Sequence, residues 1–138
     1  MKKILLVLFS ITLIYNCSSD SNSSDSSDET KQLTSKLGIW EGTGTQPGLT
    51  WTIKITLNSN EQLIEYPSLE CGGYLTLISE TSSQLLFRET ITYNSICADQ
   101  GFIELTVTSD STMDYKYYFP NASNEKGTLG ASGSISKT

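Results

Sequence analysis

The feature that most constrains the fold of this chain is an alternation of apolar and polar residues at every second position. It is clearest where Trp51, Ile53, Ile55 and Leu57 alternate with threonines and a lysine. A period of two places neighbouring side chains on opposite faces, so this segment is predicted to be a β-strand with one buried face. Similar segments, separated by turn residues at intervals of about twelve residues, are 38–43, 62–66, 74–79, 85–94, 102–107, 113–119 and 129–135.

About eight short strands with no helical pattern between them predict an all-β domain. The short turns between successive strands favour an antiparallel up-and-down arrangement. Pairing of the last segment with the first would remove two exposed strand edges. We therefore predict a small antiparallel β-barrel over residues 33–138, with a two-sheet β-sandwich as the alternative.

Charge and composition exclude several kinds of function. The formal net charge is −6, and removing an N-terminal leader that carries two lysines would make it −8, which disfavours binding to nucleic acid. The chain contains no histidine, so a Ser-His-Asp triad and every histidine-based metal site are excluded. The sequence also lacks a glycine-rich phosphate loop and a cluster of metal ligands. We predict a protein that is not an enzyme and that has no metal or cofactor.

The N-terminal residues have the features of an export signal. Lys2 and Lys3 precede an apolar run of about eleven residues, which is too short to span a bilayer. The run ends in Leu13-Ile14-Tyr15-Asn16-Cys17, which resembles the lipobox of bacterial lipoproteins, although Asn16 replaces the usual glycine or alanine. The resemblance implies a signal peptide over residues 1–16 and acyl chains on Cys17 that hold the protein on a membrane. The alternative is an ordinary cleaved secretory signal.

Residues 17–32 are predicted to be a disordered tether. After Cys17 this segment has seven serines and four acidic residues, and it has no aliphatic or aromatic side chain. Such a segment cannot bury enough apolar surface to offset the entropy of ordering. A serine and aspartate run at this position resembles the sorting signal of Bacteroidetes-type lipoproteins, which implies the outer membrane and exposure on the cell surface. The alternative is a plain spacer on a protein that faces the periplasm.

Cys71 and Cys97 are predicted to form a disulfide. They are the two cysteines that remain if Cys17 is acylated, and an exported protein folds in an oxidising compartment. The bridge would close a loop of about 26 residues, and the chain-entropy model makes that worth roughly 3.5 kcal/mol. This is a large share of the stability of a small domain.

Two stretches resemble known families. Gly38-Ile39-Trp40 is similar to the short signature of lipocalin-like barrels, which implies that the indole closes the narrow end of a cup. The stretch 66–77, Tyr-Pro-Ser-Leu-Glu-Cys-Gly-Gly-Tyr-Leu-Thr-Leu, resembles a small β domain of uncharacterised secreted bacterial proteins, and the resemblance continues with Phe87-x-Glu89-x-Ile91-Thr92 and Cys97. The second resemblance implies the same fold and supports the disulfide, and it brings no assigned activity.

Glu89 is the most unusual residue of the predicted strands, because it falls on the apolar face together with Phe87 and Ile91. A carboxylate in apolar surroundings is costly unless it is paired or hydrogen-bonded. One interpretation is that Glu89 orients a ligand inside the barrel, and the other is that it meets water, tyrosine hydroxyls or backbone amides. The predicted ligand-binding residues are Trp40, Trp51, Phe87, Glu89 and Ile91.

Tyr115, Tyr117, Tyr118 and Phe119 form an aromatic group late in the chain. Aromatic residues at alternate strand positions usually pack in a core, and this is the favoured interpretation. If Tyr118 instead faces outward, it could stack against a sugar ring.

The predicted function is that of a lipid-anchored, non-catalytic protein of the bacterial cell envelope that binds a small apolar ligand or a partner protein. The alternative is a surface interaction module, or a module that contacts glycans, with a filled core. Asp110-Ser111-Thr112 resembles an acceptor motif for O-linked glycans. A cavity inside the barrel would favour the first interpretation, because a solid interior cannot hold a ligand.

Overall fold

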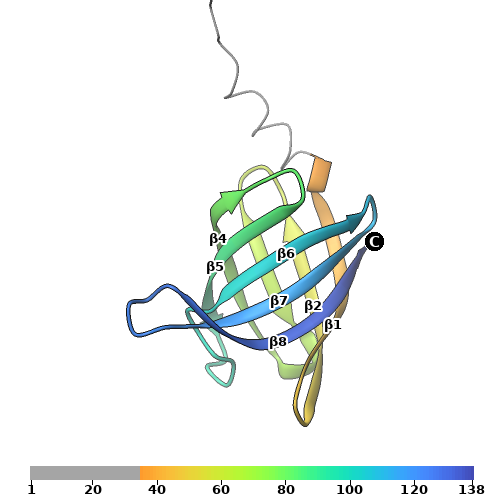
Figure 1. Ribbon diagram of the computed structural model, residues 1–138. Coiled ribbons are helices and arrows are strands. Elements are labelled where there is room, and N and C mark those ends of the chain that lie inside the picture. The colour runs from red at the N-terminus through yellow and green to blue at the C-terminus, as the bar shows by residue number, and fades with distance from the viewer. Residues whose placement is uncertain (1–34) are drawn as a thin grey trace, which may run out of the picture.

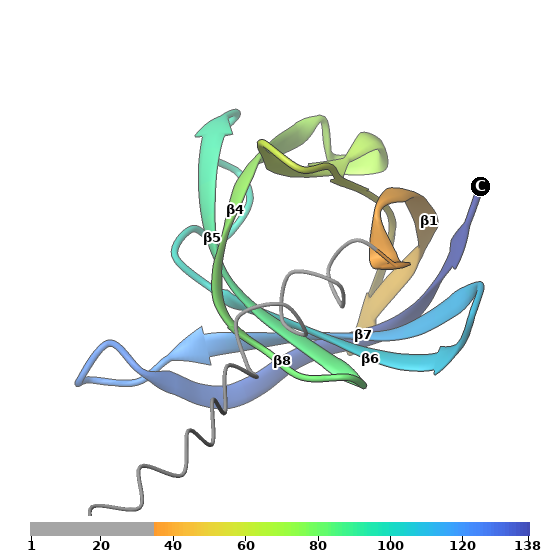
Figure 2. The same ribbon diagram turned by 90° about the horizontal axis from the view of Figure 1, so that it is seen from above.

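The computed structural model describes residues 35–138, which form a closed barrel of eight antiparallel strands (Figure 1). Each strand pairs with the next along the chain, and the last strand pairs with the first. Figure 2 looks along the barrel and shows the strands as a ring around its interior. The strands are β1 (Gly38–Gln46), β2 (Leu49–Leu57), β3 (Gln62–Tyr66), β4 (Cys71–Glu80), β5 (Gln84–Tyr93), β6 (Phe102–Ser109), β7 (Thr112–Pro120) and β8 (Lys126–Lys137).

The prediction of a small up-and-down barrel is confirmed, and the sandwich alternative is wrong. The barrel closes where β8 pairs with β1 in a register that runs from Trp40 opposite Lys137 to Thr45 opposite Ser132. All eight predicted strands are present, and Pro67 follows the end of β3 as the first residue of the 3₁₀ turn η1 (Pro67–Leu69). The predicted signal peptide, Cys17 and the tether lie outside the described residues.

Alternate side chains of the strands fill the inside of the barrel. In β2 the inward side chains of Trp51, Ile53, Ile55 and Leu57 are all buried, as the period of two predicts. The same alternation along residues 85–93 predicts that Tyr93, at the end of β5, faces inward, but its side chain is 48% exposed. β5 pairs with β6 only as far as Arg88, so the end of β5 extends beyond its neighbour and is less covered.

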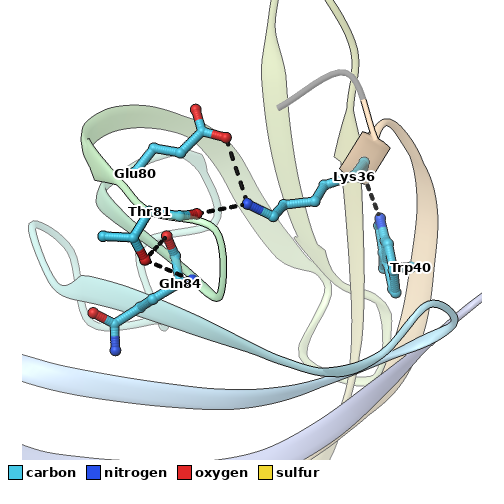
Figure 3. A network of polar contacts seen from close by, with 5 residues as sticks. All are labelled: Lys36, Trp40, Glu80, Thr81 and Gln84. Atoms are coloured by element: carbon cyan, nitrogen blue, oxygen red, sulfur yellow. Dashed lines mark hydrogen bonds and ion pairs between the residues drawn. The ribbon is translucent and has the colours of Figure 1, made fainter. Parts of the chain in front are cut away.

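One end of the barrel is closed by the chain that enters it. A short helical turn includes Lys36, whose backbone oxygen accepts a hydrogen bond of 2.9 Å from the indole nitrogen of Trp40. The ammonium group of Lys36 reaches across to the β4–β5 turn, where it donates to the backbone oxygen of Thr81 at 2.9 Å and lies 3.5 Å from Glu80 (Figure 3). Lys36 is only 5% exposed, so this contact seals the end where the described chain begins.

The predicted disulfide is confirmed. Cys71 at the start of β4 is joined to Cys97 in the loop between β5 and β6, and their Cα atoms are 6.3 Å apart. The same loop is held by Asp99, whose carboxylate accepts a hydrogen bond of 2.8 Å from the backbone N–H of Ile91. The disulfide therefore fixes a loop at the end of the barrel opposite Lys36.

Candidate functional site

A cavity of about 240 Å³ lies inside the barrel at the end opposite the Lys36 turn. It lies between β2, β3, β5, β7 and β8. The last residue of β1, the first residue of β2, the turn η1 and the β5–β6 loop also contribute to its lining. Much of its wall is aromatic, and Glu89 is the one acidic or basic residue among the described side chains that line it. The aromatic lining residues are Trp51, Tyr66, Tyr115, Tyr117 and Phe119.

Glu89 lies on β5 and is fully buried. Its Oε1 atom accepts a hydrogen bond of 2.6 Å from the hydroxyl of Tyr66. The hydroxyls of Tyr66 and Tyr115 are 3.2 Å apart, and when the Tyr66 hydroxyl donates its hydrogen bond to the Glu89 carboxylate, Tyr115 is the donor between the two tyrosines. The interpretation that a tyrosine hydroxyl reaches Glu89 is confirmed.

The burial of Glu89 changes its acidity. Loss of hydration disfavours the charged form and raises the pKa of the carboxyl group to about 7, although the hydrogen bond from Tyr66 acts in the opposite direction. The negative charge of Asp99 adds to the increase. Burial also raises the pKa of Tyr66 and Tyr115, so both hydroxyls stay neutral and can donate. Glu89 can therefore exist in either protonation state near neutral pH.

Three buried polar atoms have no hydrogen-bond partner within residues 35–138. They are Oε2 of Glu89, Nε1 of Trp51 and the hydroxyl oxygen of Tyr117. All three side chains line the cavity. Buried polar groups in native proteins are nearly always hydrogen-bonded, so a group of three at one place needs a specific explanation. Together they offer an acceptor, a donor and a hydroxyl that can act as either.

Two glycines make room for the aromatic walls. A Cβ atom at Gly44 would lie 2.8 Å from the indole of Trp51, and one at Gly101 would lie 2.1 Å from the ring of Tyr117. A side chain at either position would push the ring away from its present place. The two glycines therefore leave room for the rings of Trp51 and Tyr117. A glycine in the sequence does not by itself show which side chain takes up that room.

The rim of the cavity is largely apolar and partly exposed, with Gln46 as an exposed polar residue. Leu49 is 43% exposed, Ile96 is 76% exposed and Phe119 is 42% exposed, and all three line the cavity. Cys97 and Ala98 continue the rim on the β5–β6 loop. The disulfide therefore holds in place a loop that forms part of the entrance.

Of the predicted ligand-binding residues, Trp51 and Glu89 line the cavity, whereas Trp40, Phe87 and Ile91 do not. Trp40 lies near the Lys36 turn at the closed end, and Phe87 is fully buried in the core. The prediction included these three residues because alternation along a strand identifies its inner face. It does not give the position of a residue along the barrel axis. The assignment of a ligand site to these residues stays a prediction.

Sequence reasoning missed Tyr66 as a site residue. It shares the inner face of β3 with Ile64, which is the signal that could have found it. Tyr115 and Tyr117 are buried, as the core interpretation predicted, yet both also line the cavity. Tyr118 is half-buried; its ring is covered by Lys126 at 4.5 Å, and its hydroxyl donates to Glu104 at 3.3 Å.

Residues 35–138 contain no group of acidic or cysteine side chains that could hold a metal ion. Within the same range there is no helix long and apolar enough to cross a membrane. No family model, curated protein or solved structure matches this chain.

Proposed function

We propose that this protein is a non-catalytic lipoprotein of the bacterial cell envelope whose barrel binds a small molecule. The ligand would have an apolar body and at least one polar group, and it would occupy the cavity beside Glu89. The observation that carries the proposal is that Glu89, Trp51 and Tyr117, which all line one cavity, each have a buried polar atom without a partner among residues 35–138. Such atoms are costly to bury and gain most from a ligand that completes their hydrogen bonds.

The size of the cavity restricts the ligand. A volume of about 240 Å³ lies below the range of roughly 300–1,000 Å³ that is usual for drug-sized ligands. It equals the liquid volume of about eight water molecules at roughly 30 Å³ each. We therefore expect a compact molecule, or one end of a longer molecule that leaves the cavity past the apolar rim.

The position of the cavity suits a tethered protein. Residues 1–34 join the barrel at the Lys36 end, and the cavity is at the opposite end. If Cys17 carries the acyl chains, the 19 residues from Cys17 to Ser35 could span up to about 60 Å. The entrance would then be free to face away from the membrane surface.

An interaction module is the second candidate. The exposed apolar residues Leu49, Ile96 and Phe119 surround the entrance, and a partner protein could cover them. This alternative does not explain the buried polar atoms, so ligand binding is preferred.

The test of ligand binding uses residues 18–138, which contain every strand, the disulfide and the core. Small molecules with one polar group on an aromatic or aliphatic body are titrated while tryptophan fluorescence is followed. We expect a saturable change that is lost in Trp51→Phe and kept in Trp40→Phe, because only Trp51 lines the cavity. A panel that produces no saturable change, or one that depends on Trp40 alone, would contradict the proposal.

The anchor is tested separately on the full-length chain. Mass spectrometry of the mature protein is expected to find acylated Cys17 at the N-terminus, in the membrane fraction. Cys17→Ser should move the protein out of that fraction. An unmodified wild-type protein in the soluble fraction would refute the anchor and leave the ligand proposal intact.

A further inference from the structure

We propose that the ligand is a small organic ammonium ion whose charged nitrogen binds Oε2 of Glu89 and whose body lies against the aromatic walls. This inference rests on the proposed function, and it adds the chemical class of the ligand. It is based on the charge of the cavity and on the kind of side chains around it.

The carboxyl group of Glu89 has no positive partner within the described structure. Arg88 is next to it in the chain but points to the outside, where its guanidinium lies 4.5 Å from the ring centre of Phe102 and donates to Asn124. None of the residues that line the cavity is basic. Among residues 35–138, the fully buried carboxylate of Glu89, with one oxygen unpaired, is therefore the only formal charge of the cavity wall.

Three lysines near the barrel ends contact other groups, and one of them is Lys137, whose ammonium lies 5.4 Å from the ring centre of Trp40. Lys36 contacts Glu80 and Thr81 at the closed end, and Lys126 pairs with Glu104 on the outer face. Buried charges in proteins are paired or neutralised. No basic residue among residues 35–138 forms an ion pair with Glu89, so a ligand could supply the balancing positive charge, or a proton could take its place.

The aromatic walls favour an organic cation over a metal ion. Trp51, Tyr66, Tyr115, Tyr117 and Phe119 line the cavity. The faces of such rings carry negative potential and attract ammonium groups, and sites of this kind bind alkylammonium ligands. An ammonium can also donate a hydrogen bond to the Tyr117 hydroxyl, while the Trp51 indole requires an acceptor such as a hydroxyl oxygen. A compact amine with a hydroxyl group carries donors for Glu89 and Tyr117 and an acceptor for Trp51.

Protonation of Glu89 should compete with this ligand. The titratable groups that interact electrostatically or by a hydrogen bond with Glu89 are Tyr66 of β3, Tyr115 and Tyr117 of β7, and Asp99 of the β5–β6 loop. The tyrosines stay neutral because burial raises their pKa values, and hydrogen bonds from Ile91 and Gln100 lower the pKa of Asp99. Near neutral pH the change of charge is therefore that of Glu89, and a cation should bind more weakly as pH falls.

The test compares three molecules of the same shape and different charge. Tyramine carries an ammonium, tyrosol carries a hydroxyl in its place, and 4-hydroxyphenylacetate carries a carboxylate. Each is titrated by calorimetry into residues 18–138 at pH 8.0 and pH 5.5, where an alkylammonium keeps its proton. We expect tyramine to bind at least tenfold more tightly than tyrosol at pH 8.0, and the carboxylate not to bind. With a Glu89 pKa of about 7, the affinity for tyramine should fall about thirtyfold at pH 5.5.

Glu89→Gln removes the negative charge of the cavity and leaves its shape nearly unchanged. The variant should lose most of its affinity for tyramine and all of its pH dependence, and it should bind tyrosol as well as the wild type does or better. Circular dichroism and the melting temperature show whether the variant is folded. Trp51→Phe serves as a second variant that keeps the carboxyl group and should keep the pH dependence.

The outcomes distinguish this inference from the proposed function. Equal binding of tyramine and tyrosol, or binding of tyramine that does not change with pH or in Glu89→Gln, would overturn the ammonium inference and leave a ligand-binding barrel. Failure of all three molecules to bind would also overturn it. The proposed function fails only if the wider panel gives no change that depends on Trp51.

Discussion

At the scale of single residues, Glu89 couples protonation to folding. Its pKa is raised from 4.5 to about 7 because the folded barrel removes it from water. The folded state therefore binds this proton more tightly than the unfolded chain does. The stabilisation is fully present below about pH 4.5 and is lost as pH rises through about 7.

We predict that the free energy of unfolding of the wild type falls by about 3 kcal/mol between pH 4.5 and pH 8, relative to Glu89→Gln. Glu89→Gln keeps an oxygen that can accept from Tyr66 and removes the titrating group. Urea unfolding of both proteins at several pH values measures the difference. Parallel curves for the two proteins would show that Glu89 does not titrate in this range.

Tyr66 and Tyr117 offer a matched pair of substitutions. Tyr66→Phe removes the hydrogen bond to Glu89 and should lower the free energy of unfolding by roughly 1.5–3 kcal/mol, as is usual for a bond to a charged group. Tyr117→Phe removes a buried hydroxyl that has no partner within the described residues, so stability should stay the same or increase. Urea unfolding at pH 8 measures both. Equal losses in the two variants would contradict the assigned hydrogen bonding.

At the scale of elements, the two ends of the barrel are built differently. The turn that contains Lys36 is held by polar contacts to the β4–β5 turn and closes one end (Figure 3). At the other end the disulfide holds the β5–β6 loop at the edge of the cavity. Polar contacts therefore hold the end at which the described chain begins, and a covalent bond holds the loop at the end that has the cavity.

We predict that Lys36→Ala lowers the free energy of unfolding by roughly 1–3 kcal/mol, because it leaves the Thr81 carbonyl and the nearly buried Glu80 without their donor. The matched control is Lys54→Ala, which removes the exposed ion pair with Glu65 and should have a much smaller effect. Thermal unfolding of the two variants provides the comparison. A larger loss for Lys54→Ala would mean that the Lys36 turn does not hold this end.

At the scale of the whole molecule, the disulfide acts mainly through the unfolded chain. Cys71 and Cys97 are 26 residues apart, and the bridge limits the conformations of the unfolded state. We predict that Cys71→Ser lowers the free energy of unfolding by roughly 2–5 kcal/mol. The bridge itself is checked by intact mass before and after reduction, which should differ by two hydrogens. Rapid alkylation of both thiols in the unreduced, folded protein would contradict it.

The sequence by itself determined the secondary structure and the order of the strands. Alternation with a period of two, turn residues between the runs and the absence of helical spacing specify eight consecutive strands, because each signal is local in the chain. The same local logic identified the inner faces of β2 and β5, and hence that Glu89 points inward with Phe87. The cysteine pair followed from their number once Cys17 was set aside.

Only the tertiary structure decided where along the barrel each inward side chain lies. Trp40 and Trp51 both face inward, yet one lies at the closed end and the other beside the cavity. The contact between Tyr66 and Glu89 joins residues of β3 and β5, which are not neighbours in the barrel. Strand register, the tilt of the strands and the curvature of the closed sheet set these positions. They depend on the pairing of all eight strands, and no segment of the sequence encodes them alone.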